Sequence, residues 1–270
     1  MIWKAGSREI SLDRVLVMGI LNATPDSFSD GGLYTDAQKA AQRAAQMAAQ
    51  GADIIDIGAQ STRPGSRPID AREEWQRLES VLKAVIETVD IPISVDTFYP
   101  EVAARAVGYG ASIINDITGF QSQQMRKIAA ETGVGCVVMH SDDITQLPDY
   151  TVAVREFFEK RIDDLVREGV SREQICLDCG VGFGKTREQE IELTAHMDRL
   201  RAGDRPLLAA VSRKRMTAYC LPYDTSPDER DHATTAAHVF AILSGANILR
   251  VHNVSAAVQC IGVAEKLGKL

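Results

Sequence analysis

The chain has 270 residues, of which 45% are hydrophobic and 25% are charged, and its formal net charge is −7. This composition is typical of a globular protein with a full core, and the negative charge argues against generic electrostatic binding to nucleic acid. The longest apolar runs, such as Val15–Leu21, are far shorter than the roughly 18–20 residues of a membrane span. The opening MIWKAGSREI lacks the apolar core of an export signal, so we expect a cytoplasmic protein with neither a nucleic-acid nor a membrane partner.

Residues 1–14 contain two short segments, Ile2–Lys4 and Glu9–Ser11, on either side of Gly6 and Ser7. Two short strands joined by a tight turn form a hairpin. We expect this hairpin to cap the N-terminal end of the structure that follows.

Eight short apolar segments, each rich in Ile, Val or Leu, recur along the rest of the chain. Nearly continuous apolarity is typical of strands that are buried on both faces of a parallel sheet. The predicted strands are Val15–Ala23, Ala52–Gly58, Pro92–Thr97, Ala111–Ile117, Gly135–His140, Gln174–Cys179, Pro206–Ser212 and Ala246–His252.

Stretches with helical periodicity separate these strands, among them Asp36–Gln50, Glu73–Val89 and Val152–Glu168. A Gly-Ala pair opens three of the strands, which suits a left-handed helix cap followed at once by a strand. Eight strand–helix units in one chain of this length predict an α/β protein, a closed (β/α)8 TIM barrel that forms a single domain over residues 1–270. An open doubly wound sheet is the alternative, but its G-x-G-x-x-G fingerprint after a first strand is absent.

The five cysteines are scattered along the chain, and we expect free thiols in a reducing compartment. Cys176 and Cys179 form a lone C-x-x-C inside an apolar segment. A zinc site would need a second pair at suitable spacing, so we interpret both as core thiols.

Polar residues gather where the predicted strands end. In barrel enzymes the active site lies at this carboxyl-terminal face. One polar tip can be simply a strand's exit into solvent, but so many at one end indicate a site. The tips carry Asn22, Thr62-Arg63, Asp96, Asn115-Asp116, His140, Asp178, Ser212-Arg213-Lys214, and Arg250 with His252.

These residue types suit a flat heterocycle and an anion. A carboxylate accepts two parallel hydrogen bonds from an amidine-like edge, lysine can donate to a ring carbonyl, and arginine can stack on a flat ring. Thr62, Arg63 and His252 are suited to gripping a phosphate, and Asn22 can supply an oxygen to Mg²⁺.

Long motifs at these same positions resemble those of the dihydropteroate synthases. MGILNATPDSFSDGG at 18–32 resembles the first family signature and GADIIDIGAQSTRPG at 51–65 resembles the second. Shorter matches follow in order, and the resemblance covers nearly the whole chain: ISVDT at 93–97, IINDI at 113–117, LDCGVGFGKT at 177–186, SRK at 212–214 and RVHNV at 250–254.

The resemblance implies condensation of a pterin pyrophosphate with p-aminobenzoate on the folate pathway. It also implies a homodimer formed through barrel helices away from the mouth. Pyrophosphate would leave first and the amine would then attack a pterin methylene cation, with catalysis carried by Asp96, Asp178, Lys214, Arg63 and His252.

The resemblance also implies a binding role for individual side chains. The pterin would contact Asp96, Asn115, Met139, Asp178 and Lys214, with Arg250 stacked on the ring. The pyrophosphate would contact Asn22, Thr62, Arg63 and His252, with Mg²⁺ held near Asn22. The p-aminobenzoate site would be shaped by Phe28, Pro64, Phe183 and Lys214, and Asp30 lies in a first loop expected to close over the substrates.

The sequence departs from the family pattern at a few positions, of which Arg215 is the most consequential. Arg215 stands where the family usually has a serine that helps to bind the p-aminobenzoate carboxylate. We hypothesise that it alters recognition of p-aminobenzoate and of the sulfonamides that mimic it. The other departures are Ala59-Gln60 for Gly-Glu, Cys179 for proline, Asn253 for aspartate, and SDDITQLPDY after His140 in place of an M-x-G pattern.

Two other functions compete with the synthase. A methyltransferase that passes a methyl group from methyltetrahydrofolate to a corrinoid protein shares the pterin contacts, but it has no need of Thr62, Arg63, His252 or the TPDSFSDGG loop. A paralogue that binds pterins without condensing them is the second alternative, and a turnover assay separates it from the synthase.

Overall fold

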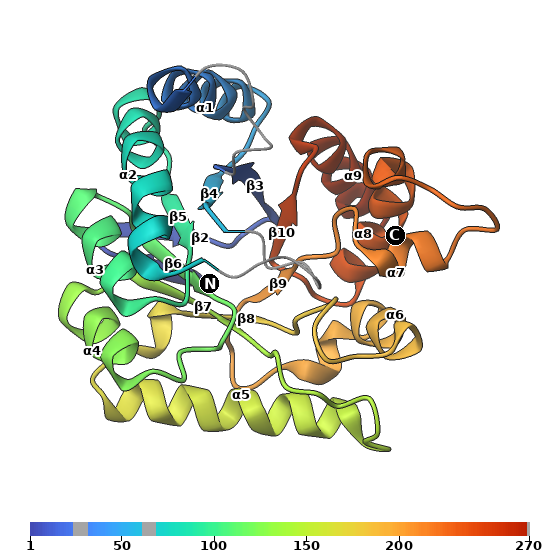
Figure 1. Cartoon of the computed structure of the whole chain (residues 1–270). Helices are drawn as coiled ribbons and strands as arrows, with labels where there is room; N and C mark the ends of the chain where they lie inside the picture. Colours follow the sequence, from blue (N-terminus) through green and yellow to red (C-terminus); the bar gives the residue numbers. More distant parts are fainter. Residues whose placement is uncertain (24–31, 61–68, 269–270) are drawn as a thin grey trace.

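Eight parallel strands form a closed barrel, and helices surround it on the outside (Figure 1). The computed structural model describes residues 1–23, 32–60 and 69–268. Hydrogen bonding runs around the barrel in the order β10-β3-β4-β5-β6-β7-β8-β9. The strands are β3 (Leu16–Asn22), β4 (Ile54–Gly58), β5 (Ile93–Asp96), β6 (Ile113–Asp116), β7 (Gly135–Met139), β8 (Ile175–Asp178), β9 (Leu207–Ala209) and β10 (Ile248–Val251).

The predicted (β/α)8 barrel is therefore confirmed, and each predicted strand segment contains one observed strand. The seventh is the most shortened, because the chain turns after Val211: Lys214 N–H donates to Val211 O and Arg213 has a left-handed φ of 58°. This turn brings the SRK residues to the barrel mouth.

Nine helices are present in the described part of the chain, and they cover the outer face of the barrel. The second shows why they form: Asp70 caps its first turn by accepting from Glu73 N–H, and Trp75, Leu78 and Val85 lie on its buried stripe. The helices are α1 (Gly32–Ala49), α2 (Ala71–Thr88), α3 (Pro100–Tyr109), α4 (Gln123–Thr132), α5 (Tyr150–Arg167), α6 (Arg187–Ala195), α7 (Arg215–Tyr219), α8 (Asp231–Leu243) and α9 (Val254–Leu267).

Strand alternation divides the barrel interior into an apolar layer and a polar layer. Ile54, Ile113 and Cys176 belong to the apolar cluster inside the lower barrel, which is the half nearer the amino-terminal ends of the strands. Two residues further along each strand, on the same face, stand polar side chains, so Asp56, Asn115 and Asp178 form part of the upper layer. Ile55, Ile114 and Leu177, which alternate with them, pack outward against the helices.

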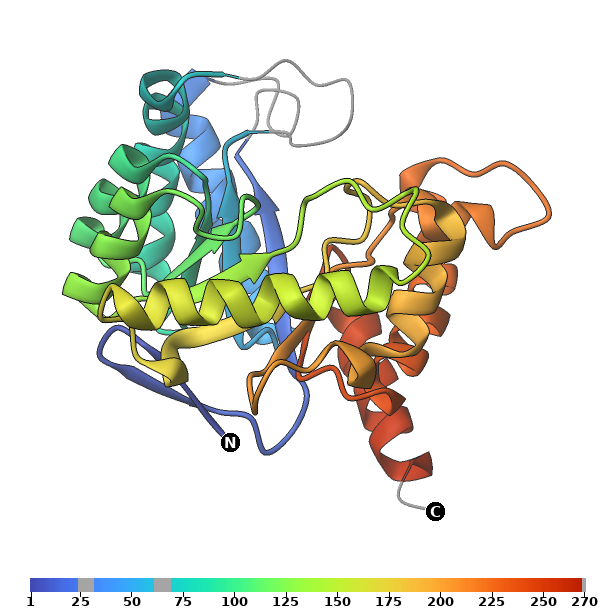
Figure 2. The same cartoon turned by 90° about the horizontal axis from the view of Figure 1, so that it is seen from below.

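The N-terminal hairpin closes the lower end of the barrel, as expected (Figure 2). It consists of β1 (Ile2–Ala5) and β2 (Arg8–Ser11), which pair antiparallel. Trp3 is fully buried in the apolar cluster of the lower barrel, and its Nε1–H donates to Gln174 O at 2.8 Å. The hairpin thus plugs the end of the barrel opposite the mouth.

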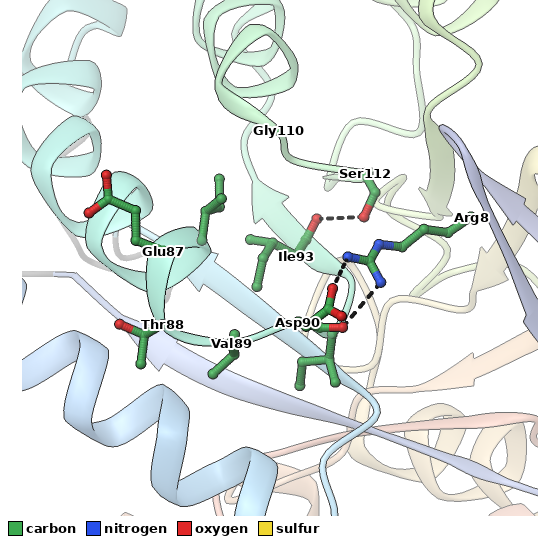
Figure 3. Close-up of a pocket in the computed structure, with 10 residues that line it drawn as sticks. Arg8, Glu87, Thr88, Val89, Asp90, Ile93, Gly110 and Ser112 are labelled. Carbon is green, nitrogen blue, oxygen red and sulfur yellow. Dashed lines mark hydrogen bonds and ion pairs between the residues drawn. The ribbon is translucent and has the colours of Figure 1, made fainter.

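A cavity of about 250 Å³ lies beside this hairpin, below β5 and β6 (Figure 3). Arg8 crosses it and donates to Asp90 through Nη2–Oδ1 at 2.8 Å and to the Asp90 carbonyl at 3.1 Å. Ser112 Oγ donates to Ile93 O. These polar groups bond one another and lie at the end of the strands away from the mouth, so we do not assign the active site to this cavity.

Candidate functional site

The polar layer at the barrel mouth is built by strand register. Neighbouring strands pair Asn22 with Gly58, Gly58 with Asp96, and Asp96 with Asn115, which puts these residues in one row. Met139 on β7 is in register with Asp178 on the neighbouring strand β8. The structure therefore brings these predicted site residues to one end of the barrel, because the strands end at the same level.

An arginine between two carboxylates forms the centre of this layer. Arg250 donates from Nε to Asp56 Oδ2 at 2.6 Å and from Nη2 to Asp96 Oδ2 at 2.7 Å. Burial opposes its charge, but Asp56 and Asp96 outweigh that effect and raise the pKa of Arg250 above its usual range. The guanidinium is thus held charged on the rim of the barrel interior.

Asp56 is a site residue that we did not predict. It is fully buried in β4, and its Oδ2 also lies 3.3 Å from Asn115 Nδ2. Because the Asn115 amide nitrogen faces Asp56, its oxygen is left to accept hydrogen bonds elsewhere. The signal for Asp56 was in the sequence: a single charge in the apolar strand IIDIG, on the inward face that it shares with Ile54.

Asp96 has an unusual affinity for protons. Burial raises the pKa of its carboxyl to about 7, and the neighbouring charges of Asp56 and Asp116 add to that effect, whereas Arg250 and Lys214 oppose it. A group that changes charge near neutral pH at a polar pocket is characteristic of a functional site.

Lys214 occupies the other side of the mouth, above the loop that follows β8. Its Nζ donates to Val181 O at 2.5 Å and lies 5.3 Å from the centre of the Phe183 ring. Burial lowers the pKa of Lys214, and the charge of Asp178 opposes that shift. Asp178 in turn accepts from Gly180 N–H through Oδ1 at 2.8 Å, which fixes the start of the same loop.

His252 is oriented by Ser212. His252 N–H donates to Ser212 Oγ at 3.2 Å, and this hydroxyl lies 2.9 Å from His252 Nδ1. A hydroxyl that accepts from the backbone can also donate its proton to Nδ1, and such a bond favours the tautomer with the imidazole proton on Nε2. Ser212 is therefore placed to orient the His252 ring.

Asp231 joins the two loops that carry these residues. It accepts from Arg213 Nε at 2.7 Å and from Asn253 Nδ2 at 2.9 Å. Asn253 also caps α9 by accepting from Ala256 N–H. An aspartate at position 253 would place a second carboxylate against Asp231, so the amide at this position has a local reason: it can donate where a carboxylate only accepts.

Two other predicted residues are placed less centrally. Met139 is buried at the end of β7. Arg215 begins α7 with an exposed side chain and forms no ion pair within the described residues. Phe28, Asp30, Thr62, Arg63 and Pro64 lie outside the described residues.

The described residues contain no group of three His, Cys, Asp or Glu side chains that could hold a metal ion. All five cysteines are free, and Cys176 and Cys179 are buried, which confirms their interpretation as core thiols. In the same part of the chain, no helix has both the length and the apolarity needed to cross a membrane.

Comparisons with known proteins agree on one family. The family described as pterin binding enzyme matches residues 18–252. The dihydropteroate synthase of Clostridium beijerinckii is 40% identical over 254 residues, which cover 93% of this chain and 94% of that protein.

Solved structures give the same result. The chain is similar to the Xanthomonas albilineans dihydropteroate synthase with 4-aminobenzoic acid, with a TM-score of 0.93, 36% identity and coverage of 100% of this chain and 98% of the other. The Yersinia pestis dihydropteroate synthase in a sulfonamide drug complex has a TM-score of 0.92 and 35% identity, with both chains covered completely.

Proposed function

This chain belongs to the family of dihydropteroate synthases, transferases of folate biosynthesis, and we propose that it condenses a hydroxymethyl dihydropterin pyrophosphate with p-aminobenzoate at its barrel mouth. The observation that carries this proposal is the linked cluster at the strand ends: Asn115 and Arg250 bond the buried Asp56 carboxylate, and Arg250 also bonds Asp96. The products would be dihydropteroate and pyrophosphate.

The pterin ring is recognised by the polar layer. Asp96 and Asp178 accept from the N–H groups of the pterin, Asn115 presents its amide oxygen, and Lys214 donates to the ring carbonyl. Arg250 stacks its planar guanidinium on the ring while its nitrogens remain bonded to Asp56 and Asp96. Met139 lines the pocket from β7.

The bond between the pterin methylene carbon and the pyrophosphate oxygen breaks first. The Asp96 and Asp178 carboxylates stabilise the positive charge that develops on the pterin, while His252 and Arg63 donate to the departing pyrophosphate. Donors fixed in advance at such a site are each worth roughly 3–4 kcal/mol of barrier height. Ser212 contributes by holding the His252 ring in place.

A magnesium ion fits the pyrophosphate end of this site. Mg²⁺ takes oxygen ligands and commonly keeps water and substrate phosphates as most of them, so one or two protein oxygens suffice. Asn22 ends β3 with an exposed side chain whose amide oxygen meets this need. When bound, the ion would supply positive charge beside the leaving pyrophosphate.

The amine of p-aminobenzoate then forms the new carbon–nitrogen bond and releases a proton. Phe183 and Lys214 contribute to the walls of this second site, and the family resemblance adds Phe28 and Pro64 to it and Thr62 to the pyrophosphate contacts, all three outside the described residues. The Phe183 ring provides a flat apolar wall, and the Lys214 ammonium above it provides a cation for the substrate. Arg215 adds a further cation at the start of α7.

One turnover assay tests the whole proposal. The protein is incubated with pterin pyrophosphate, Mg²⁺ and p-aminobenzoate, and both pyrophosphate and dihydropteroate are measured. Equal amounts of the two products are expected. Pterin binding without turnover would instead indicate the paralogue, and pyrophosphate release without dihydropteroate would locate the failure in the second site.

We also infer that the protein forms a homodimer through α8 and α9. These helices lie together on the outside of the barrel and expose large apolar side chains (Figure 1). Phe240 and Leu243 on α8 are each 61% exposed, and Val263 and Leu267 on α9 are 56% and 64% exposed. A concentration of exposed apolar residues on one surface is typical of a protein–protein interface.

Light scattering after size-exclusion chromatography tests the dimer. The wild type is expected at twice the mass of the chain, and Phe240→Glu is expected at the monomer mass. Val152→Glu, which replaces an exposed apolar residue on α5, is the matched control and should remain dimeric. A monomeric wild type would refute the inference.

The free thiols suit a reducing compartment, and we propose the cytoplasm.

A further inference from the structure

Lys185 is a buried lysine in the loop between β8 and α6. Its side chain is 6% exposed. Nζ lies 2.9 Å from Phe183 O, 3.2 Å from His140 O and 3.0 Å from His140 Nδ1. Within the described residues no carboxylate lies at ion-pair distance from it.

The three contacts match the chemistry of an ammonium. Burial lowers the pKa of Lys185, while nearby groups such as Asp178 oppose that shift. The pKa of His140 is lowered to about 3 by its burial and by the charge of Lys185, so the imidazole is neutral and Nδ1 accepts. Three N–H donors therefore face three acceptors, and an apolar side chain at this position would leave all three acceptors buried without a donor.

Lys185 lies where two loops fit tightly together. A Cβ at Gly180 would lie 1.9 Å from His140 O, and a Cβ at Gly184 would lie 2.4 Å from Asp142 O. Both glycines also have left-handed φ angles, 69° and 54°. The loop after β8 can thus lie directly against the loop after β7, and Lys185 bonds across the junction.

The same loop supports Lys214. Val181 O accepts from Lys214 Nζ, and the Phe183 ring lies beneath that ammonium. Lys185 binds the carbonyl of Phe183, so it fixes the backbone that carries the ring. The backbone of Lys214 belongs to a different segment, at the start of α7, so a shift of this loop would change the position of the Phe183 ring relative to Lys214.

We propose that Lys185 is a positioning residue for the p-aminobenzoate site, and that it acts by fixing the Phe183 ring relative to the Lys214 ammonium. This inference rests on the proposed function for the identity of the second substrate. Lys185 itself touches neither substrate; it acts through the loop of residues 181–184. The ion pair of Asp56 and Arg250 at the centre of the pterin side stands on β4 and β10, away from this loop, whereas Asp178 and Lys214 adjoin it.

The test compares Lys185→Met, which keeps the length of the side chain, with wild type and with Lys160→Met on the exposed face of α5. Lys185→Met is expected to raise KM for p-aminobenzoate by about ten-fold or more. The KM for the pterin pyrophosphate should rise by a clearly smaller factor, because the Asp56–Arg250 pair stands on other strands and only Asp178 and Lys214 adjoin the loop. Lower thermal stability with an unchanged KM would show a merely structural role and overturn the proposal.

Two further arms keep the result interpretable. If Lys185→Met does not fold, Lys185→Gln keeps donors at this position and should show a smaller rise in KM, whereas an unchanged KM in that variant counts against the proposal. The second arm needs no substrate: in a Phe183→Trp background, Lys185→Met should increase acrylamide quenching of the new indole. A wild type that consumes no p-aminobenzoate would contradict the proposed function, whereas unchanged quenching would contradict the role of Lys185.

Discussion

Asp56 and Arg250 form a buried ion pair, Oδ2 to Nε at 2.6 Å, between strands that are far apart in the sequence but adjacent to the same barrel mouth. The pair does more than neutralise two charges. Asp56 holds the guanidinium of Arg250 against Asp96 and also receives the amide of Asn115. Three groups assigned to the pterin therefore depend on one carboxylate that need not touch the substrate.

Replacing this carboxylate tests that dependence. Asp56→Asn keeps the shape of the side chain but removes its charge. Removing one partner of a buried ion pair typically costs about 3–5 kcal/mol of stability. If part of that cost appears as a loss of the geometry that binds the pterin, the affinity for pterin pyrophosphate should fall by about ten-fold or more. Because the charge of Asp56 raises the pKa of Asp96, the variant should also shift the pH dependence of pterin binding toward lower pH. Isothermal titration between pH 5 and 8 measures both.

The matched control is Asp53→Asn. Asp53 precedes the same strand but pairs with Arg14 near the opposite end of the barrel. The Asp53→Asn variant should therefore bind the pterin with unchanged affinity. Equal affinities for Asp56→Asn and wild type would show that Arg250 and Asn115 are held by other groups.

The fold was largely predictable because a buried parallel strand has a simple signature. Ile113–Asp116, for example, is short, apolar and flanked by a glycine-capped helix. The polar tips were predictable for the same reason, since Asp96 and Asp178 are the last residues of otherwise largely apolar strands. What could not be predicted was which of these groups bond one another.

Contacts across the barrel explain that limit. The bond between Asp56 and Arg250 could not be predicted because the two residues are 194 positions apart, and only barrel closure brings β4 and β10 to the same mouth. Lys185 and His140 are 45 positions apart and meet only where two loops interlock. The left-handed φ of Arg213 likewise depends on its bonds to Asp228 and Asp231, which a local pattern does not contain.

Glu74 should make the protein less stable as pH rises. Burial raises the pKa of this α2 carboxyl to about 7, with help from the charge of Asp96 and against the effect of the nearby Thr97. The folded state therefore binds the proton more tightly than the unfolded chain, so stability falls between about pH 4.5 and 7 and levels off above. A shift of this size corresponds to on the order of 3 kcal/mol.

Glu74→Gln removes this titration. Urea unfolding at pH 5 and pH 8 should show a smaller loss of stability in the variant than in the wild type, and the variant should be the more stable protein at pH 8. Parallel pH dependences for the two proteins would rule out Glu74 as the source of the slope.

Ser212→Ala should impair departure of the pyrophosphate and leave pterin recognition intact. The hydroxyl contacts both the backbone N–H and the Nδ1 of His252, so its loss removes a restraint on the orientation of the ring. A hydrogen bond of this kind contributes about 0.5–1.5 kcal/mol, which predicts a roughly two- to ten-fold fall in kcat. Affinity for a pterin without pyrophosphate should not change, and a fall in that affinity would place Ser212 in the pterin site.

Arg215→Ser should change the handling of p-aminobenzoate. The exposed arginine stands next to Lys214, where the family usually has a small hydroxyl. Steady-state kinetics should show an altered KM for p-aminobenzoate together with altered sulfonamide inhibition, and an unaltered affinity for the pterin substrate. The hypothesis fails when both the KM and the inhibition constant equal those of the wild type.

Trp3→Ala should destabilise the barrel without altering the mouth. The indole is fully buried among the apolar residues of the lower barrel, and its N–H satisfies the carbonyl of Gln174. Removing a buried tryptophan costs about 3–5 kcal/mol, so the urea midpoint should fall markedly. The KM values of the folded variant should match those of the wild type, because the polar layer lies at the other end of the strands. Ile2→Ala, which truncates an exposed neighbour in the same strand, is the control and should change stability little. A Trp3→Ala protein with wild-type stability would mean that the hairpin is not part of the barrel core.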